Sequence, residues 1–174
     1  MAIRPARDDD FDAITAITNH YITTTTIHFA YEPLTTDELR AMWHGYRDRF
    51  PWLVTEVDGA VVGYAKAGTW RDRAAYNWTA ETGIYIADGS RGKGLGKPLY
   101  IALLAALEAR GFHSALAGIT LPNEASVAMH LALGFEPCGV VQDAGFKNGG
   151  WHAVGFWQKR FSQSQNPARH DRAR

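Results

Sequence analysis

RGKGLGKPLY, residues Arg91 to Tyr100, is the stretch of this sequence that most restricts its fold. Three glycines, two lysines and one arginine stand within its first seven residues, directly before an apolar segment rich in alanine and leucine. Free backbone amides and the positive end of the dipole make a helix N-terminus favourable for an anion, and glycines let the backbone come close to it. The stretch therefore predicts a phosphate-binding loop that leads into a helix.

Two common phosphate-binding patterns do not fit this loop. A P-loop has the form GxxxxGK[ST], but Arg91 stands at the first glycine when Lys97 is taken as the lysine, and Pro98 follows. The dinucleotide-binding form GxGxxG would need a glycine where Lys97 stands. The pattern that remains is Arg-x-x-Gly-x-Gly, made by Arg91, Gly94 and Gly96. It resembles the acetyl-CoA pyrophosphate loop of GNAT acetyltransferases; the alternative is an ordinary strand-to-helix turn.

A second segment resembles the same family. Asn123–Ser126 opens the next predicted helix, which ends at Leu133-Gly134-Phe135. GNAT acetyltransferases have a helix of the form Asn-x-x-Ala-x-x-x-Tyr-x-x-x-Gly-Phe after the fifth strand; here Ser126 stands at the alanine and His130 at the tyrosine. Asn123 and His130 fall within roughly 20° of each other around a helix. One helix face could thus present an amide and an imidazole to the same ligand.

Longer segments are similar to one branch of this family, the phosphinothricin acetyltransferases. The similarity covers about residues 2–161. Members of the branch acetylate phosphinothricin, methionine sulfoximine or methionine sulfone, which are α-amino acids with a tetrahedral oxidised phosphorus or sulfur. The segments that carry the similarity are Asn19–Ile22, Arg49–Val54, Tyr76–Glu81, Leu121–Asn123 and Gly145–His152.

The resemblance implies an acetyl-CoA-dependent N-acetyltransferase that acts on the α-amino group of such a small amino acid, commonly as a homodimer. It implies a single GNAT domain of the α/β (α+β) class over residues 1–161, with a mixed, mostly antiparallel central sheet, flanking helices and one splayed strand pair. The polar residues 162–174, which include Pro167, are expected to form a flexible tail.

Local patterns place strands and helices in a matching order. Thr35 and Glu38 fit a capping box, and Asp58-Gly59 is a strong hairpin signal. Gly111 and Gly134 stand where two helices are expected to end. The predicted strands are 2–6, 52–57, 60–69, 77–87, 114–120, 135–142 and 151–161, and the predicted helices are 8–21, 35–49, 95–110 and 123–133.

Composition excludes several other classes. The 174 residues suffice for one domain with a hydrophobic core, and 18 basic residues balance 18 acidic ones, so no nucleic-acid or membrane-surface partner is expected. One cysteine allows no intramolecular disulfide, and the histidines show no HExxH or HxH grouping, so no metal is expected. No apolar run approaches the roughly 20 residues of a membrane span. The N-terminal residues lack the apolar core of a signal peptide, so a cytoplasmic protein is expected.

Glu81 is the predicted general base. Acyl transfer needs a neutral amine, yet a free α-amino group with a pKa of about 8 is largely protonated at pH 7, so a nearby carboxylate that accepts the proton promotes the reaction. Strand alternation places Glu81 on the face opposite Ala80 and Thr82, away from the more apolar side. The resemblance places a catalytic glutamate here and gives His130 the role of an acid or thiolate stabiliser. A solvated glutamate and a structural histidine are the alternatives.

The resemblance also implies that the strand before the loop parts from its neighbour near Gly83, which frees the amides of Ile84 and Ile86 to pair with the pantetheine arm. The residues expected to bind acetyl-CoA are Ile84, Tyr85, Ile86, Arg91, Gly92, Lys93, Gly94, Leu95, Gly96, Lys97 and Asn123.

Two arginines suggest how the substrate is held. Arg71 and Arg73 precede the catalytic strand and could clamp a carboxylate through paired hydrogen bonds; the alternative is two solvated loop arginines. Gly83 stands where phosphinothricin enzymes usually carry threonine, which leaves the head-group preference open. The residues expected to contact the substrate are Phe29, Arg71, Arg73, Tyr76, Gly83, Tyr85 and Tyr100.

Two other functions stay open. The same fold could acetylate a different amine, such as a protein N-terminus or an antibiotic amine. A non-catalytic acyl-CoA sensor would keep the glycine loop but would not need a base, so Glu81 favours the enzyme.

Overall fold

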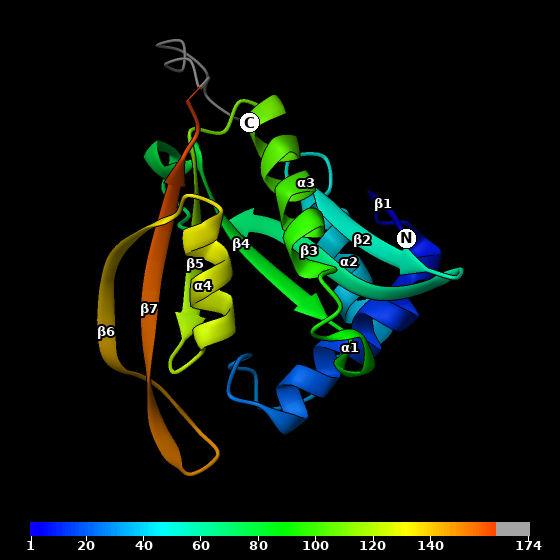
Figure 1. Cartoon of the computed structure of the whole chain (residues 1–174), viewed down its shortest axis with the longest axis horizontal. Coiled ribbons are helices and arrows are strands. Elements are labelled where there is room, and N and C mark those ends of the chain that lie inside the picture. The colour runs from blue at the N-terminus through cyan, green and yellow to red at the C-terminus, as the bar shows by residue number, and fades with distance from the viewer. Residues whose placement is uncertain (163–174) are drawn as a thin grey trace.

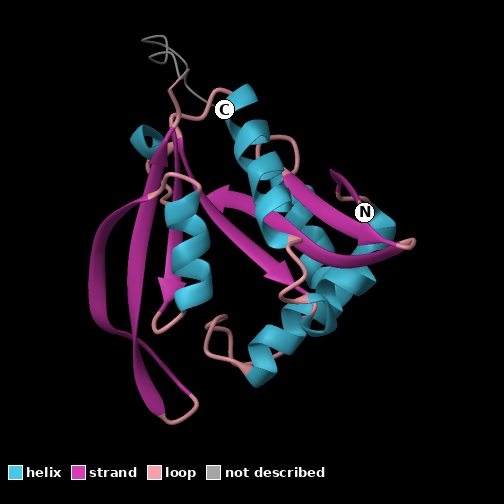
Figure 2. Cartoon of the chain, in the orientation of Figure 1, coloured by secondary structure: helices cyan, strands magenta, loops and turns pink. Residues whose placement is uncertain are grey.

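The structure, a computed structural model, describes residues 1–162, so nearly all of the predicted tail 162–174 lies outside the described residues. The described residues form one unit in which helices pack against a single seven-stranded sheet (Figures 1 and 2). The strands are β1 Ala2–Pro5, β2 Trp52–Val57, β3 Ala60–Thr69, β4 Thr79–Ile86, β5 Ser114–Thr120, β6 Glu136–Lys147 and β7 Gly150–Arg160. The α-helices are α1 Phe11–Thr24, α2 Thr36–Tyr46, α3 Gly96–Ala109 and α4 Glu124–Ala132, and single 3-10 turns cover Asp8–Asp10, Ala74–Tyr76 and Asp88–Ser90.

Local chemistry sets several of these boundaries. Thr35 accepts a hydrogen bond from the Glu38 amide, and the Glu38 carboxylate accepts one from the Thr35 amide, which confirms the capping box before α2. Asp58 and Gly59 both have positive φ, 50° and 81°, as a tight turn between antiparallel strands requires. The predicted β2–β3 hairpin is therefore confirmed.

The strand order is β1-β2-β3-β4-β5-β7-β6. Every neighbouring pair is antiparallel except β4 and β5, which run parallel. The sheet is thus mixed and mostly antiparallel, as predicted. Because the β4–β5 connection is long, it can hold both the glycine loop and α3, which crosses over the sheet.

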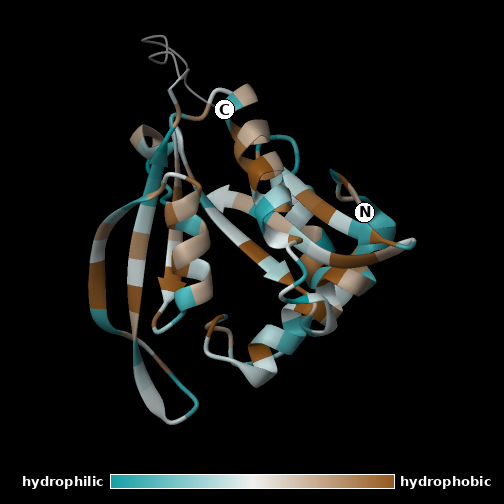
Figure 3. Ribbon diagram, in the orientation of Figure 1, coloured by the Kyte–Doolittle hydropathy of each residue, from teal (hydrophilic) through white to brown (hydrophobic). Residues whose placement is uncertain are grey.

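Helices cover both faces of the sheet, with α3 and α4 in front and α1 and α2 behind in the view of Figure 1. The front core joins α3 side chains such as Leu103 and Leu107 to Ala80, Phe112 and Trp157. The rear core packs α1 and α2 against the opposite strand faces (Figure 3). Its members include Phe11, Trp43, Trp52, Val54 and Tyr64.

Several predicted boundaries need correction: the first helix ends at Thr24 instead of 21 and the second at Tyr46 instead of 49, and two further shifts have a clear cause. The last-but-one strand runs to Lys147 instead of 142, because β6 keeps pairing with β7 through an irregular register between Val141 and Gly145. The first helix starts at Phe11 instead of Asp8, because the Asp10 carboxylate accepts the Arg7 amide at 2.7 Å and so forms a separate 3-10 turn.

Candidate active site

The sheet opens between its two parallel strands. Beyond the end of their pairing at Glu81 and Leu116, β4 continues to Ile86 paired with β3 alone. The backbone groups of β4 that face the gap have lost their ladder partners, as the expected splay requires. The opening occurs near Gly83, as predicted.

Three cavities meet at this opening. A small central cavity of about 60 Å³ lies between the separating strands, lined by residues such as Thr82, Gly83, Ala117 and His130. It shares Ile84, Asn123 and Ser126 with a second cavity of about 260 Å³, which we call the loop cavity because the glycine loop lines it. It shares Thr82, Gly83, Tyr85 and Gly118 with a third cavity of about 320 Å³, which we call the acceptor cavity. The gap thus connects the glycine loop to Glu81.

The glycine loop has the conformation that a phosphate site needs. Gly92 and Gly94 have φ of +73° and +74°, which side chains rarely adopt, and α3 begins at Gly96 with its first amides free of helical partners. An added Cβ at either Gly92 or Gly94 would meet no atom within 4 Å, so the loop is open on that side. Backbone, dipole and cavity together fit a pyrophosphate.

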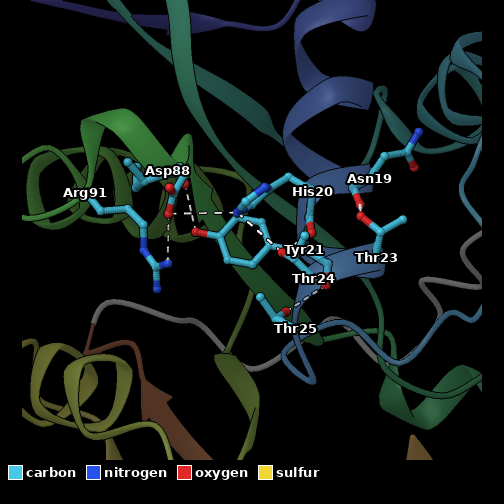
Figure 4. A network of polar contacts seen from close by, with 9 residues as sticks. Asn19, His20, Tyr21, Thr23, Thr24, Thr25, Asp88 and Arg91 are labelled. Atoms are coloured by element: carbon cyan, nitrogen blue, oxygen red, sulfur yellow. Dashed lines mark hydrogen bonds and ion pairs between the residues drawn. The ribbon is translucent and has the colours of Figure 1, made fainter. Parts of the chain in front are cut away.

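Arg91 is oriented by the end of α1 and by the preceding turn (Figure 4). Its guanidinium lies 3.3 Å from the Asp88 carboxylate and over the ring of Tyr21, 5.7 Å from the centroid. The Tyr21 hydroxyl donates to the Ile86 carbonyl at 2.7 Å and so ties α1 to the last residue of β4. The chain thus holds a cation at the mouth of the loop cavity, which Arg91 and Tyr21 both line.

Most of the predicted acetyl-CoA residues lie together around this opening, but two do not line it. Lys93 and Lys97 are exposed and line none of the three cavities. Asn123 lies just before α4, where its side-chain oxygen accepts the Ser126 amide at 3.2 Å and leaves its NH₂ group for a ligand. The predicted residues that line the central or loop cavity are Ile84, Tyr85, Ile86, Arg91, Gly92, Gly94, Leu95, Gly96 and Asn123.

Glu81 lines the acceptor cavity on the rear face of β4, as the alternation predicted. Partial desolvation by the surrounding walls raises the pKa of its carboxyl, and the charge of Lys66 partly counteracts this. A Cβ added at Gly118 of β5 would lie 3.7 Å from Glu81 Oε1, so a glycine keeps the carboxylate accessible from that side. The position suits a base that is open to substrate.

Lys66 is a residue that the sequence reasoning missed. It stands opposite Gly83 in the β3–β4 ladder, on the same face as Glu81, and lines the acceptor cavity. Burial lowers the pKa of its ammonium, and the charge of Glu81 partly opposes this. The period-two pattern that placed Glu81, applied to Tyr64, Lys66 and Gly68, could have indicated it.

His130 is buried behind the central cavity in a chain of hydrogen bonds. Its Nδ1 lies 2.7 Å from the Ser126 carbonyl, and its Nε2 lies 3.0 Å from the Tyr100 hydroxyl. Tyr100 in turn lies 2.6 Å from the Thr82 hydroxyl, which donates to the Leu116 carbonyl at 3.0 Å. Desolvation lowers the pKa of His130, and the bond to Ser126 opposes this.

Only some of the residues expected to contact the substrate line a cavity. Gly83 and Tyr85 line the acceptor cavity, whereas Phe29, Arg71, Arg73 and Tyr76 line none of the three cavities. Arg71 and Arg73 are exposed on the loop after β3, where the Arg71 guanidinium lies 5.0 Å from the centre of the Trp70 ring.

Tyr100 needs a correction. It was expected to contact the substrate, but its side chain is fully buried in the front core and its hydroxyl is engaged by Thr82 and His130. The side chain therefore serves the hydrogen-bond chain behind the central cavity.

The loop after α1 lies beside the site, because its residue Ile27 lines both the central cavity and the loop cavity. Lys147 at the end of β6 donates to the carbonyls of Ile22 and His28 at 2.5 and 2.6 Å, and so holds the loop after α1. The Ala30 amide donates to His28 Nδ1 at 3.2 Å. Burial, with the charges of Lys66 and Lys147, lowers the pKa of His28 to about 4, so this imidazole is neutral.

The described part of the chain has neither a cluster of metal ligands nor a membrane-spanning helix. Its His, Cys, Asp and Glu side chains form no group of three or more that could hold a metal ion. None of its helices has the length and apolar character required to cross a membrane.

Comparisons with known proteins show which family this chain belongs to. The model of the acetyltransferase (GNAT) domain family matches residues 3–153. The chain is 47% identical over 167 residues to the phosphinothricin N-acetyltransferase of Streptomyces viridochromogenes, covering 96% of this chain and 91% of that one. It is 34% identical to the L-methionine sulfoximine/L-methionine sulfone acetyltransferase of Salmonella typhimurium, covering 96% and 98%.

The fold is also similar to that of a solved structure. The crystal structure of a GNAT superfamily phosphinothricin acetyltransferase from Sinorhizobium meliloti, in complex with acetyl-CoA, superimposes with a TM-score of 0.92 at 31% identity. The match covers 97% of this chain and 94% of that one.

Proposed function

Because this chain belongs to the GNAT acetyltransferase family, we propose that it transfers the acetyl group of acetyl-CoA to the α-amino group of a small amino acid of the phosphinothricin, methionine sulfoximine or methionine sulfone type. The single observation that carries the proposal is the opening after Glu81 and Leu116, which joins the glycine-loop cavity to a cavity lined by a carboxylate.

The residues present fit acetyl-CoA. The free amides at the start of α3 and the oriented Arg91 would hold the pyrophosphate, and the unpaired backbone of β4 around Ile84 and Ile86 would pair with the amide groups of the pantetheine arm. When bound, acetyl-CoA supplies an activated acetyl thioester. The central cavity, between the loop and acceptor cavities, is where the reacting carbon fits.

Glu81 is the proposed base. A carboxylate in the acceptor cavity can take the proton from the substrate ammonium, directly or through water, and leave a neutral amine to attack the thioester carbon. Its raised pKa brings it closer to that of the amine and makes the transfer easier, while its access to solvent allows the proton to leave.

His130 is proposed to stabilise the departing thiolate. Its Nδ1 must carry a proton, since the Ser126 carbonyl can only accept. Three contacts link His130 Nε2 to the Tyr100 hydroxyl, the Tyr100 hydroxyl to the Thr82 hydroxyl, and the Thr82 hydroxyl to the Leu116 carbonyl. When His130 is neutral, Nε2 carries no proton, so the two hydroxyls supply only two protons for these three contacts. Protonation of Nε2 would supply the third proton. Burial opposes this by lowering the pKa of His130, and negative charge that forms on the departing sulfur would favour it.

A thiol-release assay with different amines distinguishes the proposed activity from two alternatives, an acyl-CoA sensor and an acetyltransferase for other amines. An acyl-CoA sensor would bind acetyl-CoA and release no thiol with any amine, whereas an enzyme for protein N-termini or antibiotic amines would release it only with those. We expect thiol release with methionine sulfone, methionine sulfoximine or phosphinothricin. Binding of acetyl-CoA in calorimetry, without turnover of these three or other amines, would refute the proposed activity.

A homodimer is proposed as well, in a cytoplasmic protein. Large apolar side chains are exposed along β6 and β7, and a second copy could cover them. Light scattering coupled to gel filtration would test the assembly, and cell fractionation the location. The residues in question, with their exposed fractions, are Val140 50%, Val141 51%, Phe146 47% and Trp151 64%.

A further inference from the structure

Lys66 places its side-chain nitrogen in the acceptor cavity without an ion pair to any residue that the structure describes. Among the residues that the structure describes, no carboxylate oxygen lies within 4.0 Å of its Nζ. The ammonium instead faces the ring of Trp52, with Nζ 5.1 Å from the ring centroid. A partly buried cation with only an aromatic face beside it retains capacity for an anionic partner.

Lys66 and Glu81 form a matched pair of opposite charges. Lys66 stands opposite Gly83 in the β3–β4 ladder, and Glu81 is two residues before Gly83 on the same face. Diagonal neighbours of this kind have Cα atoms about 7–8 Å apart, so their side chains can approach the same small molecule. The two charges are close enough that each shifts the pKa of the other group, yet too far apart to form an ion pair.

An α-amino acid carries the complementary charges: an ammonium that suits Glu81 and a carboxylate that suits Lys66. Its ammonium and carboxylate are attached to one carbon, so the carboxylate carbon is only two bonds from the nitrogen that the base must reach. A cation for that carboxylate must therefore stand beside the base. Lys66 meets this requirement. Arg71 and Arg73 line neither the central cavity nor the acceptor cavity.

We propose that Lys66 binds the α-carboxylate of the acceptor and selects free α-amino acids over amines that lack a carboxylate at this position, such as peptide N-termini. The inference rests on the proposed function and deepens it. In this arrangement the substrate amine faces Glu81, its carboxylate contacts Lys66 Nζ on the cavity side, away from the Trp52 ring, and its side chain extends toward Met42 and Tyr46 at the α2 wall of the cavity.

The test compares an acid with its amide. Methionine sulfone and methionine sulfone carboxamide share the amine and the side chain and differ only in the carboxylate charge. The protein variants are Lys66→Met, which keeps the stem against Trp52, and Lys66→Arg, which keeps the charge. Arg160→Met is the control, because it removes one positive charge at an exposed ion pair with Glu136 on the outer strands.

We expect Lys66→Met to raise KM for methionine sulfone about 10- to 100-fold, as for loss of a charged hydrogen bond, with little change in kcat. KM for the carboxamide should stay within about twofold, so the preference for the acid collapses. Lys66→Arg should recover most of it, and Arg160→Met should match the wild type. Equal losses for acid and carboxamide, or an unchanged preference in Lys66→Met, would overturn the proposal.

A binding measurement separates this inference from the proposed function. Calorimetry of methionine sulfone against the complex with free CoA, which carries no acetyl group, needs no turnover. Weaker binding in Lys66→Met than in the wild type, with no difference for the carboxamide, supports the carboxylate site even if acetylation fails. No binding, or binding independent of Lys66, overturns it.

Discussion

Glu81 of β4 and Leu116 of β5 form the last pair of the only parallel ladder in the described sheet. The carboxylate that can accept a proton thus stands where the sheet starts to open. The first part of β4, paired on both sides, fixes Glu81. The second part, from Thr82 to Ile86, pairs with β3 alone and offers the backbone groups on its open side to a ligand.

Glu81→Gln removes the proposed base and keeps its shape. We expect kcat for methionine sulfone to fall about 10²- to 10⁴-fold, the range for loss of general-base catalysis. The glycine loop is untouched, so acetyl-CoA affinity should stay within about twofold by calorimetry. Near-normal turnover in this variant would show that another group or bulk water takes the proton.

The pH dependence of kcat should reveal the Glu81–Lys66 coupling. Glu81 must be ionised to act, and desolvation raises its pKa, so kcat should fall as the pH drops through a value above that of an ordinary glutamate. Lys66→Met removes the charge that counteracts this rise, so the acid limb should move to higher pH. Profiles of kcat against pH at constant ionic strength, for the wild type, Lys66→Met and Lys66→Arg, test this coupling. The acid limb of Lys66→Arg should stay at the wild-type pH.

Tyr100→Phe interrupts the chain between His130 and Thr82. The loss of the hydroxyl leaves His130 Nε2 without its buried partner, so we expect a loss of about 1–3 kcal/mol in the free energy of unfolding. If His130 serves the thiolate, kcat should also fall, by about tenfold, since the imidazolium loses its acceptor. Thr82→Val is the matched variant, which keeps the His130–Tyr100 contact. Denaturant unfolding and single-turnover kinetics measure the two effects; unaltered kcat in Tyr100→Phe would contradict the catalytic part.

Gly94→Ala tests the glycine loop. Its φ of +74° is strained for alanine by about 1–2 kcal/mol, so the loop should shift and acetyl-CoA should bind roughly tenfold more weakly. Gly45→Ala is the control, because Gly45 lies inside α2 with ordinary φ and room for a methyl group. That variant should bind acetyl-CoA normally and gain up to about 1 kcal/mol of stability. Calorimetry and thermal unfolding report both, and equal affinity of the two variants would argue against a backbone role for the loop.

Lys147→Met should loosen the loop after α1, whose Ile27 lines the central and loop cavities. The buried ammonium donates to the carbonyls of Ile22 and His28, which would both lose a partner. We expect a loss of about 1–3 kcal/mol in the free energy of unfolding and faster amide exchange over residues 25–34. Arg160→Met, at an exposed ion pair, should change stability by less than about 1 kcal/mol. Unchanged exchange in the loop would show that other contacts hold it.

Short-range chemistry made much of the fold predictable. The capping box of α2, the Asp58-Gly59 turn and the glycine that follows α3 depend on neighbouring residues, so their patterns can be read directly. The end of β6 was missed because Asp143, directly after the predicted strand, looks like a turn residue, and only the renewed pairing of Gly145–Lys147 with β7 extends the strand beyond it.

The site was predictable to a similar degree. The position of Glu81 and the glycine loop followed from alternation and motif, and the family resemblance supplied His130. Tyr100 was misplaced because its role depends on Thr82 and His130, which lie 18 and 30 residues away in the chain. Lys66 was overlooked because a lysine in a predicted strand is ordinary until the opposing strand is known.

The sequence by itself determined the anion-binding loop, the face of β4 that carries Glu81 and the order of strands and helices, because these depend on periodicity and backbone preferences over a few residues. Only the tertiary structure decided that the sheet opens beyond Glu81, that Lys66 lies on the same face as Glu81 without an ion pair among the described residues, and that Tyr100 contacts His130. These relations join segments distant in the chain, and their energies come from packing and from charges in a partly desolvated cavity, which no local pattern encodes.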